Sequence, residues 1–500
     1  MAKYEIKDGV GIIPEGTTKI EENAFEASFK ECMVLTSIVI PDSVTKIGES
    51  AFKYCLGLTS IVIPDSVTEI EESAFEGCEG LTSIVIPDSV TEIGDLAFSI
   101  CPGLTRIVVS EGNKGYDSRN NCNAIIETNT NKLLFGCKNT IIPDSVTEIG
   151  DDAFSDCMEL TSIVIPNSVT EIGNGAFSSC DGLTSIVIPN SVTEIGNGAF
   201  SSCRGLTSIV VPNSVTIIRN YAFWGCTSLT SIFIPDSVTE IGYGAFWSCT
   251  SLTSIVVPDS VTKIEDNALL DCMGLTRIVV SEGNKVYDSR NNCNAIIETD
   301  TNKLLFGCKD TIIPDSVTEI EGGAFRGCKG LISIVIPNSV TRIGYGAFAY
   351  CSGLTSIVIP DSITKIGYGA FSHCTSLTSI VIPDSVTEIG SDAFSHCTSL
   401  TSIVIPDSVT GIGSFGFQNC IGLTNVVIGY SVARIGGRAF VDCEGLTSVV
   451  FNNPTMEIED GAFEGCSCLK EIKVPAQSGD YYRKLLPNGL HALIVEQSAD

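Results

Sequence analysis

A motif of 23 residues returns along almost the whole chain. In the copy at Leu58–Gly80 it reads LTSIVIPDSVTEIEESAFEGCEG. Its opening leucine recurs at Leu35, Leu58, Leu81, Leu104, Leu160, Leu183, Leu206, Leu229, Leu252, Leu275, Leu331, Leu354, Leu377, Leu400, Leu423, Leu446 and Leu469. A fixed repeat of this length is typical of a solenoid, in which each coil packs only against the coils before and after it. The repeat therefore predicts a stack of coils, where 500 residues would otherwise suggest several globular domains.

The pattern inside one coil predicts which side chains face the core. Leu58, Ile61 and Ile63 have the spacing of a leucine-rich-repeat strand. Pro64 cannot donate a ladder hydrogen bond, so we expect the strand to end there. A second short extended segment follows, and Glu72–Cys78 is expected to form a helical turn whose alanine, phenylalanine and cysteine face inward. The predicted fold class is an α/β leucine-rich-repeat solenoid with short strands and a short helical turn in each coil.

Departures from the repeat divide the chain into parts. The first coil is irregular, so residues 1–34 are predicted to be an N-terminal capping coil that covers an open end of the core. Residues 35–474 are the predicted solenoid, which contains two enlarged coils at 104–136 and 275–307. After residue 474 the repeat stops, and residues 475–500 are predicted to be a C-terminal cap with a short helix at Asp480–Leu486 and a last strand.

The two enlarged coils are nearly identical and lack both the proline turn and the Ala-Phe pair. The runs NAIIE and KLLFG, separated by a polar stretch, predict a β-hairpin in each. Pairing the turn ends of these runs would put Cys122 opposite Cys137, and Cys293 opposite Cys308. Cross-strand distances permit a disulfide, so we hypothesise a disulfide in each hairpin.

Most of the 22 cysteines occupy one position of the repeat, from Cys32 and Cys55 through to Cys466. Free cysteine is among the most buried residue types and packs like a small apolar side chain. The pattern therefore predicts a ladder of buried thiols inside the solenoid and fits a reducing compartment.

Charge and hydropathy bound the partners and the location. The 59 acidic and 29 basic side chains give a net charge of −30, which disfavours nucleic acid and anionic membrane surfaces as partners. No apolar run approaches the length of a membrane span, so membrane insertion is not expected. Neither a signal peptide nor a lipid anchor is visible, so the chain as written is expected to be cytoplasmic.

Candidate catalytic and metal-binding residues are few. His373 and His396 share one position in neighbouring coils, each directly before a cysteine, and such a cluster can bind a metal ion. Their cysteines, however, belong to the inward-facing position. The aspartates that follow proline, such as Asp65 and Asp236, recur identically and suit a solvated edge better than a calcium site or a catalytic carboxylate pair. We expect no cofactor, no metal and no enzyme activity, with a carbohydrate-active β-solenoid enzyme as the catalytic alternative.

Binding is the better-supported use, because the positions around the Ala-Phe pair vary most between coils. Aromatic residues occupy these positions at Tyr221, Trp224, Tyr243, Trp247, Tyr345 and Tyr368. Partly exposed aromatic side chains commonly anchor protein interfaces, so these six are the predicted partner-binding residues. The alternative is that the rings only cover an edge of the core.

The signatures C-x-x-L-x-x-I-x-I-P and I-G-x-x-A-F-x-x-C closely resemble the BspA-like (Treponema pallidum-type) leucine-rich repeat family over about residues 8–475. The resemblance implies a right-handed solenoid that binds proteins and is not an enzyme. Members of the family are often surface-exposed or secreted, and some are adhesins, so the expected partners include host extracellular-matrix or cell-surface proteins. We expect a monomer. An intracellular interaction scaffold is the alternative function.

Overall fold

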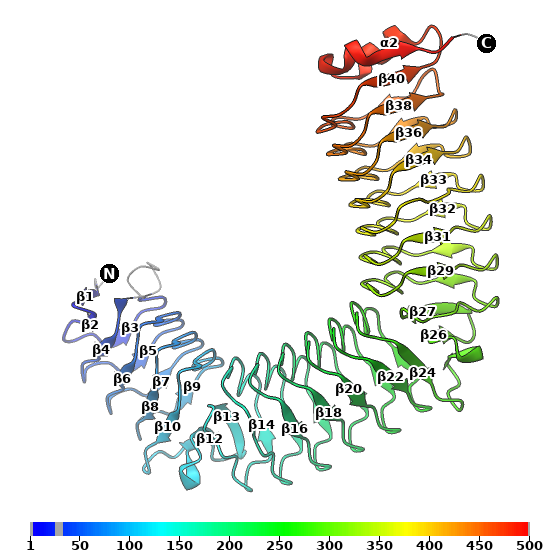
Figure 1. Ribbon diagram of the computed structural model, residues 1–500. Helices are drawn as coiled ribbons and strands as arrows, with labels where there is room; N and C mark the ends of the chain where they lie inside the picture. Colours follow the sequence, from blue (N-terminus) through cyan, green and yellow to red (C-terminus); the bar gives the residue numbers. More distant parts are fainter. Residues whose placement is uncertain (1–3, 26–33, 499–500) are drawn as a thin grey trace. The chain divides into compact units, whose positions relative to one another are not determined.

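A computed structural model describes residues 4–25 and 34–498. The chain divides into two compact units, and Figure 1 labels their elements along the chain. Unit 1 comprises residues 1–252 and 263–268, and unit 2 comprises residues 253–262 and 269–500. Both units consist of coils stacked through parallel strands, so the predicted solenoid of 23-residue coils is confirmed.

A regular coil supplies one strand to each of two parallel rows. The first row comes from the Ser-Ile-Val stretch, where β4 (Ser37–Val39) and β6 (Ser60–Val62) pair with like positions opposite one another. The second row comes from the pair that ends in isoleucine, as in β5 (Lys46–Ile47) and β7 (Glu69–Ile70). A step of one repeat thus places each side chain beside its own counterpart in the next coil.

The same two rows account for most strands. In unit 1 the other first-row strands are β8 (Ser83–Ile86), β10 (Arg106–Val109), β16 (Ser185–Val187), β18 (Ser208–Val210) and β20 (Ser231–Phe233). The other second-row strands of unit 1 are β3 (Lys19–Ile20), β9 (Glu92–Ile93), β14 (Glu148–Ile149), β15 (Glu171–Ile172), β17 (Glu194–Ile195), β19 (Ile217–Ile218), β21 (Glu240–Ile241) and β23 (Lys263–Ile264).

Unit 2 repeats this arrangement. Its first-row strands are β22 (Ser254–Val257), β24 (Arg277–Val280), β29 (Ser333–Val335), β31 (Ser356–Val358), β34 (Ser402–Ile405), β36 (Asn425–Ile428), β38 (Ser448–Phe451) and β40 (Glu471–Val474). Its second-row strands are β28 (Glu319–Ile320), β30 (Arg342–Ile343), β32 (Lys365–Ile366), β33 (Glu388–Ile389), β35 (Gly411–Ile412), β37 (Arg434–Ile435) and β39 (Glu457–Ile458).

The segment between the second-row strand and the cysteine, here called the turn edge, is a run of tight turns. Within one coil the Ala74 amide donates to the Glu71 carbonyl at 3.3 Å, and the Cys78 amide donates to the Phe75 carbonyl at 3.2 Å. These are i to i+3 bonds of successive single turns, with Ser73 and Gly77 at positive φ values of 56° and 72°, in the segment where a helical turn was expected. The intervening amides bond to the next coil, as the Phe75 amide does to the Ala97 carbonyl at 2.9 Å. The ladder between coils therefore continues through the turn edge.

Rows of apolar side chains fill the interior of both units. The leucine, isoleucine, valine, alanine and phenylalanine positions of the repeat are buried. Neighbouring phenylalanines stack, as Phe52 does on Phe75 with ring centroids 5.1 Å apart. The Cys78 thiol donates to the Phe52 carbonyl at 3.2 Å, and this bond recurs along each unit. The predicted ladder of buried thiols is confirmed for the described cysteines of this position except the half-buried Cys466, while Cys32 lies outside the described residues.

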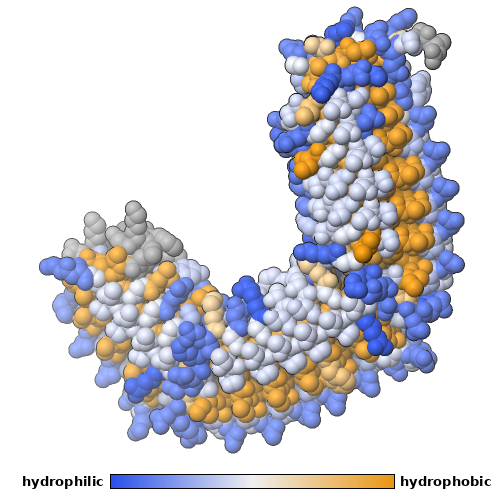
Figure 2. All heavy atoms as spheres, in the orientation of Figure 1, coloured by the Kyte–Doolittle hydropathy of each residue, from blue (hydrophilic) through white to orange (hydrophobic). Residues whose placement is uncertain are grey.

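The outward side of the first row is apolar too. Figure 2 shows apolar residues gathered in bands along both units, and the outward valines of the first-row strands are among the exposed apolar residues. Val187, for example, is 81% exposed. Threonine hydroxyls beside these valines donate to the threonine carbonyl one coil earlier, as from Thr207 to Thr184 at 3.1 Å. This face is nearly uniform from coil to coil.

Each enlarged coil carries a small antiparallel arrangement instead of a turn edge. In unit 1, β11 (Tyr116–Asp117) pairs with β12 (Ala124–Glu127), which pairs with β13 (Lys132–Gly136), and the 3-10 helix η1 (Arg119–Asn121) joins the first two strands. Unit 2 has the same elements in β25 (Tyr287–Asp288), η2 (Arg290–Asn292), β26 (Ala295–Glu298) and β27 (Lys303–Gly307). The predicted hairpins are confirmed.

The predicted placement of cysteines across these hairpins is wrong. The register begins as expected at the turn end, but a β-bulge within β12 shifts it by one residue farther along. Cys122 is consequently not opposite Cys137, and both are buried free thiols. The bulge recurs in β26, where Cys293 and Cys308 are free as well.

Additional elements flank the repeats at the chain ends. In unit 1, β1 (Glu5–Lys7) pairs in antiparallel fashion with β2 (Val10–Ile12), which joins the first row through β4. In unit 2, α2 (Gly479–Leu485) and the 3-10 helix η3 (Asn488–Leu493) lead into β41 (Ile494–Glu496), which pairs with β40. Tyr482 of α2 is fully buried and stacks on Phe451 with centroids 4.9 Å apart. The expected helix and last strand are present.

Candidate functional site

Bulky side chains at left-handed backbone positions mark unusual points of the turn edge. Many coils place glycine, asparagine, aspartate or serine at these positions, and the first three tolerate a positive φ best. Tyr221, Tyr350, His373 and His396 are among the bulky residues that instead adopt a positive φ, at 57°, 61°, 59° and 60°, and Phe415 is another, at 58°. A left-handed conformation costs a residue that has a Cβ about 1–2 kcal/mol, so the backbone does not favour these side chains. Tyr221 belongs to an aromatic cluster in unit 1, and Tyr350, His373 and His396 belong to a second cluster in unit 2.

The unit 1 cluster brings together four of the six predicted residues, Tyr221, Trp224, Tyr243 and Trp247. The Tyr221 ring lies edge-on to Trp224 at 6.4 Å and to Tyr243 at 5.3 Å between centroids. Trp224 and Trp247 are 6.5 Å apart. Tyr221 is 37% and Trp224 is 41% exposed, whereas Tyr243 and Trp247 are half-buried. The cluster thus both covers the core edge and presents two rings to solvent.

A cleft of about 510 Å³ lies against this cluster. Its lining residues are Gly175, Asn197, Gly198, Ser201, Tyr221, Trp224 and Trp247. The cleft exists because two successive coils carry glycine at the left-handed position where the next coil carries Tyr221. The cleft therefore has large aromatic rings along one side and small residues at its base. The opening is almost entirely apolar, so it suits an apolar side chain of a partner.

Unit 2 has a groove of about 210 Å³ between two rows of side chains on the turn edge. The tyrosine row consists of Tyr345, Tyr368 and Asp392, and the imidazole row consists of Tyr350, His373 and His396. The two rings of the tyrosine row stack 5.1 Å apart. In the imidazole row the tyrosine ring lies 4.3 Å from the first imidazole, and the two imidazoles lie 4.2 Å apart, as their shared repeat position predicted.

Charged neighbours set the electrostatics of this groove. The negative charge of Asp392 and the hydrogen bond to its carboxylate raise the pKa of Tyr368. Burial, followed by the nearby His396 and Arg326, lowers the pKa of His373. The Arg326 guanidinium lies over the Tyr350 ring, 4.8 Å from its centroid. His373 is therefore held neutral between an aromatic ring and a second imidazole.

The sequence singled out only part of this groove. Tyr345 and Tyr368 were predicted as binding residues and the two histidines were noted, but Tyr350, Asp392 and Arg326 were not. Tyr350 and Tyr345 lie five positions apart in one coil, on the two sides of the Ala-Phe pair. Comparing both sides of that pair in successive coils would have revealed two facing rows, although Asp392 follows the equivalent position, Ser391, by one residue.

The histidine–cysteine pairs do not assemble a metal centre in the structure. The Cys374 thiol donates to the Phe348 carbonyl at 3.2 Å inside the core, on the other side of the backbone from its neighbour's imidazole. Within residues 4–25 and 34–498, no group of three or more His, Cys, Asp or Glu side chains is arranged to hold a metal ion. The helices of these same segments also lack the length and apolar character needed to cross a membrane.

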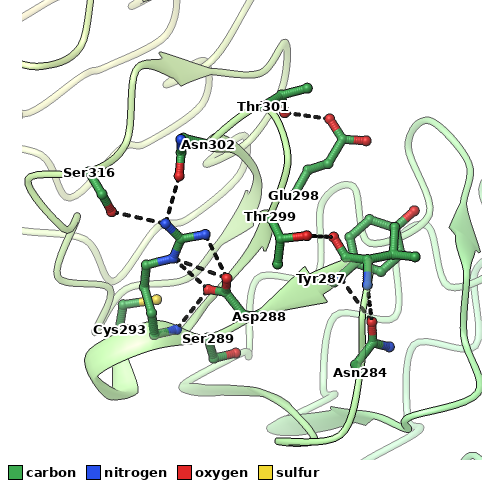
Figure 3. A network of polar contacts seen from close by, with 12 residues as sticks. Asn284, Tyr287, Asp288, Ser289, Cys293, Glu298, Thr299, Thr301, Asn302 and Ser316 are labelled. Atoms are coloured by element: carbon green, nitrogen blue, oxygen red, sulfur yellow. Dashed lines mark hydrogen bonds and ion pairs between the residues drawn. The ribbon is translucent and has the colours of Figure 1, made fainter.

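Polar side chains of the enlarged coils form hydrogen-bonded networks, and Figure 3 shows the one in unit 2. Arg290 donates to the Asp288 carboxylate at 2.6 and 2.8 Å, to the Asn302 side-chain oxygen at 2.6 Å and to the Ser316 hydroxyl at 3.2 Å. Asn284 donates to the carbonyls of two residues in the preceding coil. Unit 1 repeats the network around Arg119. These side chains anchor an irregular loop to its neighbours.

Regular coils with two parallel strand rows, a leucine- and isoleucine-lined core and a variable turn edge define a leucine-rich-repeat solenoid. The sequence model of the BspA type leucine rich repeat region matches residues 18–134, 125–224, 193–299, 297–409 and 364–484. The chain therefore belongs to the BspA-type leucine-rich repeat family, which confirms the resemblance drawn from the motifs.

Two solved structures share this fold. A leucine rich cell surface protein from Faecalibacterium prausnitzii A2-165 is 32% identical with a TM-score of 0.50, and the match covers 72% of this chain and 83% of that one. A leucine-rich repeat protein from Eubacterium ventriosum ATCC 27560 is 28% identical with a TM-score of 0.51, over 57% of this chain and 83% of that one. Comparison with curated proteins gave no match.

Proposed function

We propose that this chain is a non-catalytic protein-binding scaffold with an adhesin-like role toward cell-surface or matrix proteins. The observation that carries the proposal is the unit 1 cleft, where Tyr221 and Trp224 stand partly exposed beside an apolar hollow. Exposed aromatic residues at the rim of a concavity are the usual anchors of protein interfaces. The similar Faecalibacterium protein is described as a cell surface protein, which supports a cell-surface location for this chain. Caps at residues 1–34 and 475–500 around a repeat region at 35–474 are part of this proposal.

The charge of the chain and the lining of the cleft also limit the kinds of partner that can bind. A net charge of −30 favours a partner with a neutral or basic surface, because like charges would slow the approach. The apolar lining favours an aliphatic or aromatic side chain inserted between Tyr221 and the glycine floor. Tyr345 and Tyr368 lie in a more polar groove, so the proposed protein anchor is confined to unit 1. An interaction scaffold inside the cell is the second candidate, since a ladder of buried cysteine thiols suits a reducing compartment.

The test compares capture of proteins by the wild-type chain and by Trp224→Ser and Trp247→Ser variants. Immobilised chain is exposed separately to an extracellular-matrix extract and to a cytosolic extract. We expect a defined matrix partner whose affinity falls at least about tenfold in Trp224→Ser, as for a truncated interface anchor. Tyr430→Ser is the control, because Tyr430 is 61% exposed and lies outside the cluster.

Thermal unfolding of the same variants separates binding from stability. Equal partner affinity in wild type and in both tryptophan variants would refute the anchor. A large loss of thermal stability in Trp224→Ser would instead show that the ring serves the core edge. A partner captured only from cytosol would favour the intracellular scaffold.

A further inference from the structure

The tyrosine row and the imidazole row turn the edges of their rings toward the unit 2 groove. His373 has Tyr350 on one face and His396 on the other, with interplanar angles of 16° and 6°. Only the edge of that imidazole is therefore available to a ligand. The Tyr345 and Tyr368 rings are stacked in the same manner across the groove. Each coil thus contributes ring edges at intervals of about 4.8 Å, the spacing of parallel strands.

Those rims carry hydrogen-bonding groups. Asp392 and Tyr368 both line the groove, and the Asp392 carboxylate, whose charge raises the pKa of Tyr368, offers lone pairs to a ligand. The His373 Nδ1 atom lies 2.8 Å from the Ser372 hydroxyl, and among the described residues no hydrogen bond engages its other ring nitrogen. Ser372 and Ser395 share a hydrogen bond of 2.8 Å on the floor. The groove therefore presents both acceptors and donors, in contrast to the apolar cleft of unit 1.

One end of the groove also exposes an aromatic face. The coil before Tyr345 has Gly322 and Gly323 at the corresponding positions, so no side chain lies over that end of the tyrosine row. Tyr345 is 59% exposed. A flat apolar ring face next to a run of hydrogen-bonding edges matches a molecule whose own rings have apolar faces and polar rims.

We propose that the unit 2 groove binds a neutral oligosaccharide that lies along the coils, with one sugar ring stacked on Tyr345 and the next ones bonded to Asp392 and His373. Sugars offer many hydroxyl donors and acceptors together with apolar ring faces. An acidic ligand is disfavoured by Asp392 and by the net charge of −30, since Arg326, the cation in the lining, already forms an ion pair with Asp271. An apolar peptide side chain would leave the polar rims unsatisfied. This binding is independent of the protein anchor in unit 1.

Isothermal titration calorimetry with the full chain tests the proposal. The probes are three linear neutral hexasaccharides, cellohexaose, chitohexaose and maltohexaose, and an acidic one, hexagalacturonate. We expect at least one neutral probe to bind and the acidic probe to bind at least about tenfold more weakly. Tyr345→Ala, which removes the stacking face, and Asp392→Asn, which keeps the shape but removes the charged acceptor, should each weaken that binding at least about fivefold.

Trp224→Ser serves as the matched control, because it alters an exposed aromatic ring in the other unit. It should leave saccharide binding unchanged, and the two groove variants should leave partner capture by the unit 1 cleft unchanged. Failure of the neutral probes to bind, or binding insensitive to both groove variants, would overturn the proposal. So would a protein ligand whose binding needs Tyr345 while the saccharides do not bind. Thermal unfolding of Tyr345→Ala and Asp392→Asn checks that both are folded.

Discussion

Single cysteines in this fold occupy two contrasting environments. Burial raises the pKa of Cys101 and of Cys203 to about 12, so at neutral pH their thiols stay protonated. Cys468, by contrast, is exposed. Because the thiolate is the reactive form, the buried cysteines are protected twice: reagents cannot reach them, and their thiols do not ionise at neutral pH.

Alkylation should therefore be selective. Brief treatment of the native protein with iodoacetamide at pH 8 is expected to modify Cys468 while leaving Cys101 and Cys203 unmodified, as read by peptide mass spectrometry. Cys468→Ser should abolish this early modification, whereas unfolding in denaturant should expose the ladder cysteines to the reagent. Rapid labelling of Cys101 in the folded chain would contradict the burial described here.

The burial of a residue could be predicted from its position in the repeat. Contacts between residues of neighbouring coils were harder to predict. The burial of Phe75 and Cys78 follows from their recurrence at one step of 23 residues. The groove partner Asp392 was missed, because its role depends on Tyr368 in the preceding coil. A residue with a fixed repeat position can be assigned from sequence, while a pair formed across coils needs the geometry of both turns.

The hairpins of the enlarged coils were also predicted only in part. Their strands were predicted because NAIIE and KLLFG alternate like strands between turn residues. The third strand, β11, was not predicted, and the bulge that separates Cys122 from Cys137 has no sequence signature that the repeat could supply. Irregular segments lack a counterpart in neighbouring coils, so register there depends on side-chain bonds.

Arg290 should hold its enlarged coil in place. We expect Arg290→Ala to lower the free energy of opening the β26–β27 hairpin by about 2 kcal/mol, since hydrogen bonds made by a charged donor contribute about that much. Hydrogen exchange of the amides in residues 295–307 measures this opening. Faster exchange should be confined to the enlarged coil and its neighbours.

Arg342→Ala provides the comparison. Its side chain is 65% exposed and makes an ion pair with Glu319, so its loss should change stability by less than about 0.5 kcal/mol. Equal exchange rates in Arg290→Ala and in wild type would show that the polar network is dispensable.

At the scale of the whole molecule, the number of coils can change without changing the register in which neighbouring coils pair. The parallel ladders between regular coils link positions one repeat apart, as Ser37 with Ser60 and Lys46 with Glu69. Removal of residues 59–81, which joins Leu58 to Thr82, keeps every row aligned. We expect this shortened chain to fold, with a far-ultraviolet circular dichroism spectrum per residue close to that of wild type and cooperative thermal unfolding.

Removal of residues 59–80 leaves one extra leucine at the junction and is the matched control. A shift of one position in a strand moves inward side chains to the outer face, so this variant is expected to lose several degrees of melting temperature or to aggregate. Comparable stability of the two deletions would mean that stacking in register is not what stabilises the coils.

The hydrogen bonds between coils, through both strand rows and the turn edge, run along the stacking direction. A tensile load applied along that direction would therefore act on all coil boundaries in series, and the weakest boundary would open first. Such a chain yields in small successive steps and lengthens while its remaining coils stay folded. A tether with that mechanical response dissipates sudden pulling, a useful property for any protein that holds its partner against flow.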